Sequence, residues 1–393
     1  MLRLTNTVQP YAWGSTSAIP QLLGVEPDGS PQAELWIGAH PSAPSDAEGV
    51  PLDERIAADP EDLLGGRGER LGFLLKVLAA AAPLSLQAHP DRETAARRFA
   101  EEEAAGVAHD APHRLYKDAE HKPELLYALE PFAAMAGFRA PAAAAELLAG
   151  LQLQELPPDC ADLLEALLAE LRGADEEQAL RAATRRLLTA PAEAVSPLVE
   201  AVATACEDVD DLSARCVVDL AGHHPGDPGV LVSTLLNQVR LQPGEALYLP
   251  AGNVHAYLEG TGVELMASSD NVLRGGLTPK HVDVDELLRV LDFRVLPPPL
   301  LAPRRVSADE QVFAPADVDD FALTVLRVRP GAATTWTAAL PRTLLCLDGS
   351  VRVASARGEL VLERGQSAFA AAAEHPLTVT GDGRLAAAAP REG

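Results

Sequence analysis

The sequence has few cysteines, few aromatic residues and no long uninterrupted apolar run. Its four cysteines form no Cys-x-x-Cys pair, which argues against a disulfide framework and against a thiolate metal site. No segment approaches the roughly 18 apolar residues of a membrane span, and the first residues lack the apolar core of a signal peptide. We therefore expect a cytoplasmic protein that does not attach to a membrane.

Positive charge is also scarce. The chain of 393 residues carries 57 acidic and 32 basic side chains, a formal net charge of −25, which disfavours nucleic acid and anionic membranes as partners. Its hydrophobic fraction of 47% is enough to bury a core of useful size. A small anionic substrate is compatible with this charge only where the site creates a local positive field.

The residue pattern changes along the chain. Residues 1 to about 90 alternate short apolar runs with turn residues, and the same pattern returns from about residue 237, which predicts strands, with helices expected over 51–64, 91–106 and 282–293. Residues 141–220 show helical periodicity broken by Pro, Gly and Asp. After a proline-rich linker, residues 306–393 again indicate strands. We expect a mainly β protein with two cupin-type jelly-roll β-barrels and an α-helical subdomain, the first barrel being discontinuous. The first barrel is expected to combine residues 1–140 with 221–295.

One turn carries a specific signal. Gly244 is followed, after five residues, by Pro250-x-Gly252-x-x-His255, a pattern typical of the second motif of cupin barrels. A segment that ends at His375 repeats this spacing one residue short, with alanine in place of both the proline and the second glycine. We expect the C-terminal barrel to keep the shape and to bind no metal at His375.

Four residues suggest a metal site. Gln87 and His89 lie two positions apart in a predicted strand, so both side chains point to the same face. With Glu124 and His255 they offer one amide oxygen, two imidazoles and one carboxylate, a set that suits catalytic zinc and that manganese, iron or cobalt also tolerate. A Gln-x-His pair alone is usually structural, and the cupin turn alone does not specify a reaction. His121 has the wrong offset for a ligand and is either a substrate contact or structural.

Four blocks of sequence resemble the signature blocks of the type I mannose-6-phosphate isomerase family. They appear in the family order, together with N-terminal segments YAWGS and AELWIGAHPSAPS that are similar to that family as well. The blocks are LGFLLKVLAAAAPLSLQAHPD (71–91), YKDAEHKPELLYAL (116–129), PAGNVHAYLEG (250–260) and SSDNVLRGGLTPKHVDVDELL (268–288). One departure is the run Asp118-Ala119-Glu120, where the family has Asp-x-Asn.

The resemblance implies a function and a set of site residues. The family interconverts mannose 6-phosphate and fructose 6-phosphate on one bound zinc ion, feeding mannose metabolism and the supply of GDP-mannose. Its metal ligands correspond to Gln87, His89, Glu124 and His255, and its catalytic arginine to Arg274. Blocks that line the substrate pocket contain a serine and three lysines, namely Ser85, Lys76, Lys122 and Lys280.

The reaction requires a base, and the sequence leaves its identity open. Aldose–ketose isomerisation moves a proton between carbon 1 and carbon 2 through an enediol, so it needs a base, a group that polarises the carbonyl, and donors for the oxyanion. Arg274 can be an oxyanion donor. Glu264, in a predicted strand, is slightly preferred as base over Asp270, while zinc-bound hydroxide or a histidine is also possible.

Two other functions compete with isomerisation. One is a non-catalytic cupin that binds sugars or regulates, against which the complete ligand set and Arg274 argue. The other is a cupin oxygenase, which usually uses iron with more histidine ligands. We expect a small sugar phosphate as the partner, and a monomer.

The lysines are unevenly placed. Only four of the 32 basic residues are lysines, and Lys76, Lys122 and Lys280 all fall inside the blocks that carry the ligands or Arg274. Since an ammonium and a planar guanidinium are not interchangeable, this distribution suggests contacts with the substrate's phosphate or hydroxyls. Lys117 is the exception, expected to be solvated.

Overall fold

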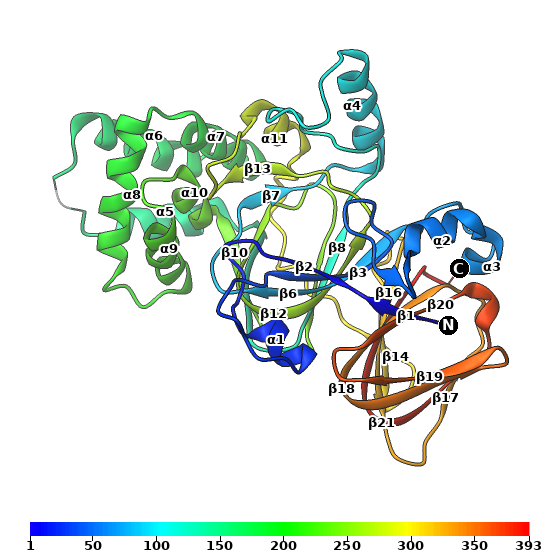
Figure 1. Ribbon diagram of the computed structural model, residues 1–393. Helices are drawn as coiled ribbons and strands as arrows, with labels where there is room; N and C mark the ends of the chain where they lie inside the picture. The colour runs from blue at the N-terminus through cyan, green and yellow to red at the C-terminus, as the bar shows by residue number, and fades with distance from the viewer. Residues whose placement is uncertain (154, 393) are drawn as a thin grey trace.

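A computed structural model describes residues 1–153 and 155–392 of the chain (Figure 1). It is mainly β, with two antiparallel sheets and a group of helices, as the sequence predicts. Neither path of hydrogen-bonded neighbours returns to its first strand over the described residues. Within these residues, no helix has both the length and the apolar character needed to cross a bilayer.

The first sheet contains ten strands among the described residues and carries the predicted metal ligands. These strands are β2 (Thr7–Gln9), β3 (Glu34–Gly38), β6 (Phe73–Ala80), β7 (Leu86–Ala88), β8 (Glu124–Ala128), β9 (Phe132–Phe138), β10 (Leu236–Leu241), β11 (Ala246–Leu249), β12 (His255–Ala267) and β13 (Leu273–Gly276). Most of them are apolar runs without a polar face: every residue of β3, β6 and β8 is buried. Such runs are expected of strands covered on both faces.

Strand β12 is the centre of this sheet. Its C-terminal part pairs with β6 and β8, while its N-terminal part pairs with β7 and β9. The register places His255 opposite Gln87, and Met266 opposite Glu124. Because one strand spans both parts, residues about 170 positions apart in sequence come to lie on adjacent strands.

The second sheet contains eleven strands among the described residues, mostly from the C-terminal part of the chain. They are β1 (Leu2–Thr5), β4 (Asp46–Ala47), β5 (Val50–Pro51), β14 (Arg304–Arg305), β15 (Glu310–Phe313), β16 (Ala322–Val328), β17 (Thr334–Trp336), β18 (Arg342–Ser355), β19 (Gly358–Glu363), β20 (Ser367–Ala370) and β21 (Leu377–Ala389). Strand β1 pairs with β20, with Leu2 opposite Phe369, so the start of the chain belongs to the C-terminal sheet. Local pattern cannot reveal such a pairing, because it does not specify the partner strand.

The helices lie mainly beside the first sheet (Figure 1). They are α1 (Ala18–Leu23), α2 (Leu52–Ala58), α3 (Pro60–Leu64), α4 (Arg92–Ala104), α5 (Pro141–Gly150), α6 (Pro158–Leu171), α7 (Glu176–Thr189), α8 (Ala192–Cys206), α9 (Leu212–His223), α10 (Pro228–Val232) and α11 (Val284–Val290), with 3-10 turns at Ser233–Leu235 and Ala372–Glu374. The helical segment thus continues past residue 220 to Leu235. Asp227 caps α10 by accepting a hydrogen bond from the Gly229 N–H.

Helix α4 begins where the sequence predicts. The Asp91 carboxylate accepts a hydrogen bond from the Thr94 N–H at 2.7 Å, which satisfies one of the free N–H groups at the helix start. The cap fixes the direction in which the chain leaves His89, two residues earlier.

Two hydrophobic clusters hold these parts together. One joins helices α5–α10 to β9, β10 and β13 through residues such as Leu167, Leu198 and Phe138. The other lies between the two sheets and contains Leu75 and Val263 from the first, and Phe313 and Phe369 from the second. The face of the C-terminal sheet that includes Phe313 and Phe369 therefore packs on the sheet that carries the predicted ligands.

Candidate metal centre

The four predicted ligands come together at one end of three strands. Gln87 is the middle residue of β7, and His89 directly follows that strand. Glu124 is the first residue of β8 and His255 the first of β12. Three of them, His89, Glu124 and His255, place one donor atom each within 4.8 Å of one another, the only such group of His, Cys, Asp and Glu over residues 1–153 and 155–392.

The donor atoms face a common point in a buried site. His89 Nε2 lies 3.2 Å from Glu124 Oε1, and His255 Nε2 lies 3.3 Å from Glu124 Oε2. Yet within the described chain, His89 Nε2 and Glu124 Oε2 have no hydrogen-bond partner. Buried polar atoms are normally satisfied, so this arrangement fits a cation at their centre.

Gln87 completes the set. Its side-chain amide lies 3.3 Å from His255 Nε2 through the atom placed as Nε2. The two ends of an amide are distinguished only by their hydrogen bonds, so a half-turn about the last side-chain bond would present Oε1 to the same point. The amide oxygen can therefore be a neutral fourth ligand.

Backbone carbonyls set the tautomers of both histidines. His89 Nδ1 donates to the Asn271 carbonyl at 2.7 Å, and His255 Nδ1 donates to the Asn253 carbonyl at 3.0 Å. Each ring therefore carries its proton on Nδ1 and turns the lone pair of Nε2 toward Glu124. Burial lowers the pKa of His89 to about 4, so its imidazole is neutral near pH 7. Neutral imidazoles are the form that binds a metal.

The cupin turn positions His89 as well as His255. The Gly252 N–H donates to the His89 carbonyl at 2.9 Å, and Gly252 has a φ of 77°. A Cβ at this position would lie 2.9 Å from the Val290 carbonyl oxygen. Glycine is therefore required for both its left-handed backbone and its close approach.

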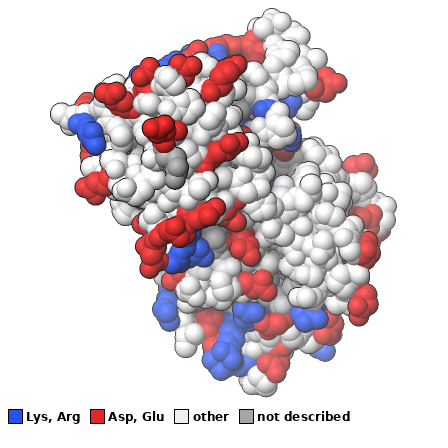
Figure 2. Space-filling model, turned by 90° about the vertical axis from the view of Figure 1, so that its left-hand side faces the viewer, with Lys and Arg blue, Asp and Glu red and all other residues white. Residues whose placement is uncertain are grey.

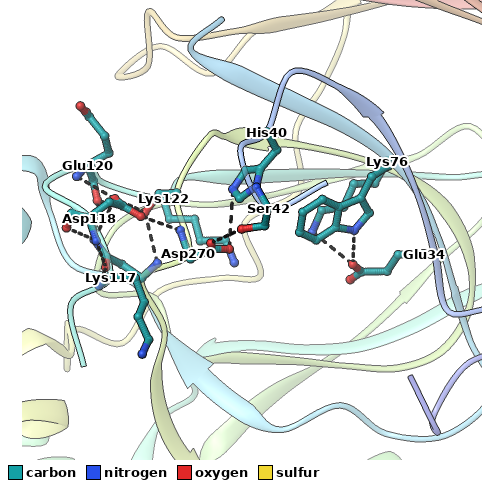
Figure 3. Close-up of polar contacts among 12 residues, drawn as sticks. Glu34, His40, Ser42, Lys76, Lys117, Asp118, Glu120, Lys122 and Asp270 are labelled. Atoms are coloured by element: carbon teal, nitrogen blue, oxygen red, sulfur yellow. Dashed lines mark hydrogen bonds and ion pairs between the residues drawn. The ribbon is translucent and has the colours of Figure 1, made fainter. Parts of the chain in front are cut away.

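Beside these ligands lies a buried charge cluster on three adjacent strands. Lys76 Nζ is 3.1 Å from Glu264 Oε2 and 3.6 Å from Glu34 Oε2, and all three side chains are less than 10% exposed. Trp36 donates from Nε1 to Glu34 at 2.6 Å, and Lys76 lies over the Trp36 ring. Figure 3 shows Lys76 and Glu34 near each other. Burial raises the pKa of Glu264, an effect that the neighbouring Lys76 charge opposes. The sequence analysis did not name Glu34 or Trp36, although both lie in the AELWIGAHPSAPS segment.

Lys122 contacts the predicted ligand Glu124 directly. Its Nζ is 3.2 Å from Glu124 Oε1, and the side chain is almost fully buried. Burial would raise the pKa of Glu124, but its contacts with the His89 imidazole and the Lys122 ammonium hold this pKa well below its usual range. Glu124 is thus an anion ready to bind a cation.

Two polar loops close this region (Figure 3). Asp270 accepts a hydrogen bond from the Ser42 hydroxyl at 3.2 Å, and His40 Nε2 lies 3.6 Å from its carboxylate. Asp270 also donates from its N–H to Asp118. His40 is buried, and its contact with Asp270 links the first sheet to the loop before β13.

Asn271 organises the loop that differs from the family pattern. Its side chain is fully buried, donates to the carbonyl groups of Asp118 and Glu120, and accepts from the Lys117 N–H. Its own carbonyl is the acceptor for His89. Asn271 could not be predicted from sequence, because a single asparagine in a loop carries no signal until its contacts are known.

Arg274 lies on strand β13, next to Gln87 on β7, and Lys280 follows β13 in the chain. Arg274 is opposite Gln87 in the register of β13 and β7. Because these strands are antiparallel, the chain leaves β13 near the N-terminal end of β7, which Ser85 directly precedes, and continues to Lys280. Burial lowers the pKa of Arg274, and burial together with the Arg274 charge lowers the pKa of Lys280. Among the described residues, neither cation has a carboxylate within 4.0 Å, so this pair provides the local positive field that an anionic substrate needs.

The remaining predicted residues lie elsewhere. His121 Nε2 is 2.9 Å from Asp320, a residue of the C-terminal part, rather than facing Glu124. Lys117 is exposed at Nζ and donates to the His109 carbonyl. His375 Nδ1 donates to the Ala372 carbonyl, and it belongs to no metal-binding group over the described residues.

One face of the molecule carries more acidic than basic side chains. Figure 2 shows a face on which Asp and Glu side chains outnumber those of Lys and Arg, in keeping with the net charge of −25. The cations Lys76, Lys122 and Arg274 are buried or half-buried, and they provide local positive charge in a molecule whose net negative charge repels anions.

Comparisons with known proteins agree with this geometry. Residues 1–141 match the family model described as phosphomannose isomerase type I, catalytic domain, and residues 310–390 match mannose-6-phosphate isomerase, cupin domain. The chain is 39% identical to the mannose-6-phosphate isomerase of Escherichia coli over 98% of each chain, and 34% identical to that of Rattus norvegicus over 95% of this chain and 94% of the relative. A crystal structure of mannose 6-phosphate isomerase bound with zinc and yttrium superimposes with a TM-score of 0.90, 37% identity and full coverage of both chains.

Proposed function

Since this chain belongs to the type I phosphomannose isomerase family, we infer that it is a zinc-dependent enzyme that interconverts mannose 6-phosphate and fructose 6-phosphate. The observation that supports this most directly is the buried His89, Glu124 and His255 group, whose donor atoms lie within 4.8 Å of one another. Two of these side chains, His89 at Nε2 and Glu124 at Oε2, have an atom without a hydrogen-bond partner among the described residues. A reading as a non-catalytic sugar-binding cupin is not favoured, since the curated relatives are isomerases along nearly their full length.

We propose Gln87, His89, Glu124 and His255 as the zinc ligands. Two neutral imidazoles, one amide and one carboxylate leave a bound Zn²⁺ with a net charge near +1. When bound, the ion supplies Lewis-acid polarisation of the substrate's oxygens. The chain's own part includes orienting the two imidazoles, His89 through the Asn271 carbonyl and His255 through the Asn253 carbonyl.

Glu264 is the proposed base. Its carboxylate is buried, it lies on the strand that begins with His255, and its raised pKa suits a group that must both accept and return a proton. Lys76, in contact with Glu264, is placed to bind a sugar hydroxyl and to keep the carboxylate ionised. Asp270 is the second candidate, but it is more exposed and already holds the loop of Ser42.

Substrate binding is assigned to the cations around the ligands. Arg274 and Lys280, with Ser85 nearby, carry no ion pair among the described residues and are free to meet oxyanions. Arg274 is proposed to stabilise the oxyanion that develops in the transition state. Lys122, next to Glu124, is proposed to contact the substrate's oxygens.

The finer organisation is part of the same proposal. The two sheets are proposed to be cupin-type jelly-roll barrels, with residues 1–140 and 221–295 as the catalytic unit, 141–220 as a helical insertion and 306–393 as a degenerate barrel. The loss of Pro and Gly from the turn before His375 supports the last assignment. Four buried free cysteines support a cytoplasmic location. The isomerase activity would give the protein a role in carbohydrate metabolism, and we propose a monomer.

Metal analysis together with an isomerase assay tests the function. The purified protein is expected to hold about one zinc per chain and to convert mannose 6-phosphate to fructose 6-phosphate, and chelation should abolish turnover. A protein that remains fully active after thorough removal of metal would contradict the zinc assignment. Zinc without turnover would support the sugar-binding alternative instead.

A further inference from the structure

The C-terminal sheet contains a cavity of about 560 Å³ that plays no part in the proposed isomerisation. It is lined by residues of β15, β16, β17, β18 and β21 and by the chain's last residues, all outside the sheet that carries His255. Its volume falls in the range of small-molecule sites in proteins, roughly 300–1,000 Å³.

The cavity arises from a change of residue type along one face of the sheet. On β16, Leu326 and Val328 belong to a hydrophobic cluster, whereas Ala322 and Thr324, on the same face, line the cavity. On β18, Leu344 is in that cluster and Arg342, two residues earlier, lines the cavity. One end of this face is therefore filled with aliphatic side chains, and the other end is left open by small and polar ones.

Arg342 is the central polar group of the cavity. Its side chain is only 6% exposed, and Nη1 donates to the Ala338 carbonyl at 3.0 Å and the Leu340 carbonyl at 3.3 Å. Its guanidinium carbon lies 5.3 Å from the Trp336 ring centroid. Over residues 1–153 and 155–392, no carboxylate comes within 4.0 Å of it, and Nε and Nη2 make no hydrogen bond to a described residue. An unpaired, buried guanidinium is costly unless an anion or solvent meets its free N–H groups.

The rest of the lining favours an anion that carries hydroxyl groups. Three arginines and two glutamates line the cavity, a net of one positive charge in a chain whose total is −25. One of the two carboxylates, Glu310, accepts a hydrogen bond from Trp336 Nε1 at 2.9 Å. Thr324, Thr335 and Thr337 add hydroxyl groups that can donate and accept.

We propose that this cavity is a second binding site, for a small hydroxylated oxyanion held by Arg342. A planar guanidinium can bind a carboxylate or a phosphate through two parallel hydrogen bonds. The threonines would meet the hydroxyl groups of the same ligand. This site is separate from the metal centre, and its existence does not depend on the isomerase activity.

Calorimetric titration of the full-length zinc protein tests the proposal with three probes that share one skeleton. Glucose 1-phosphate and glucuronate distinguish phosphate from carboxylate on the same pyranose ring, and glucose is the uncharged control. At least one anion should bind with a dissociation constant tighter than about 1 mM, and glucose should not. Preference between the two anions identifies which oxyanion the site takes.

Variants assign the binding to the cavity. Arg342→Met should weaken it at least about tenfold, the scale of a hydrogen bond to a charged group. Ala322→Leu, which fills the cavity and leaves Arg342 in place, should do the same. Arg327→Met, at an exposed position of the same strand β16, is the matched control and should bind like the parent protein. Unchanged isomerase activity and melting temperature would show that the variants are folded.

Three outcomes would overturn the proposal. The first is that no anion binds, which would mean that solvent alone fills the cavity. The second is binding that survives both Arg342→Met and Ala322→Leu, which would place the anion elsewhere. The third is binding that Arg327→Met reduces equally, which would indicate nonspecific attraction of anions.

Discussion

Lys76 and Glu264 form a buried ion pair across neighbouring strands, with Nζ 3.1 Å from Oε2 and the two residues directly opposite in the register of β6 and β12. Removing one partner of such a pair leaves an uncompensated charge, whereas replacing the carboxylate by an amide keeps the shape and removes the ability to accept a proton. This relationship makes the role of Glu264 testable by substitution.

Glu264→Gln should lower kcat by about 10²- to 10⁴-fold, the contribution expected of a general base. Zinc content should not change, because Glu264 is not among the proposed ligands. Glu259→Gln, at an exposed position of the same strand, is the control and should retain full activity. Near-normal turnover in Glu264→Gln would move the role of base to Asp270 or to a group at the metal.

The pH dependence of the reaction should report the same carboxyl group. Burial raises the pKa of Glu264 above its ordinary value of 4.5. A base works only when ionised, so kcat/KM should fall as the pH drops through this raised pKa, and the acid limb should lie above pH 4.5. The pH profile of the residual activity in Glu264→Gln should lack this acid limb. An acid limb that is unchanged in the variant would assign it to another group.

His255→Ala should lose both bound zinc and turnover, since it removes one of the two imidazoles that face Glu124. The matched control is His375→Ala in the C-terminal sheet. Among the described residues that imidazole makes a polar contact only with the Ala372 carbonyl, so turnover should stay within about threefold of the parent enzyme. Metal analysis and initial rates decide the matter, and a metal ion found at His375 would contradict the assignment of a degenerate barrel.

Arg274→Ala should reduce kcat by about 10²- to 10³-fold, the scale of removing one oxyanion donor, with a much smaller change in KM. The half-buried guanidinium has no ion pair among the described residues, so its charge is available to the substrate. Steady-state kinetics on mannose 6-phosphate separate the two constants. A loss confined to KM would make Arg274 a phosphate anchor.

Lys122→Arg should cost at least about tenfold in kcat/KM, roughly 1.4 kcal/mol, because a wide planar guanidinium does not fit where the compact ammonium lies 3.2 Å from Glu124. Lys117→Arg is the paired control, since Lys117 is exposed at Nζ and donates only to a backbone carbonyl. Zinc content should be equal in both proteins. If both behave like the parent, the lysine pattern has no bearing on the substrate.

Much of the metal centre could be predicted from sequence, because its signals are local. Gln87 and His89 share a face by strand alternation, and the Pro250-x-Gly252-x-x-His255 turn depends on a residue that tolerates a φ of 77°. The helix that begins after Asp91 follows from its cap, which acts over three residues. These features depend on backbone geometry that a few neighbouring residues determine.

Long-range pairing determined the rest. The sequence by itself specified which residue types offer zinc ligands and where helices and strands form, since both follow from the chemistry and spacing of near neighbours. Only the tertiary structure brought Glu34 and Lys76 to Glu264, turned His121 toward Asp320, and placed the first strand in the C-terminal sheet. It also revealed the cavity around Arg342. The physical reason is that a buried charge finds its partner, and a strand its neighbour, through packing over the whole fold, which local periodicity does not encode.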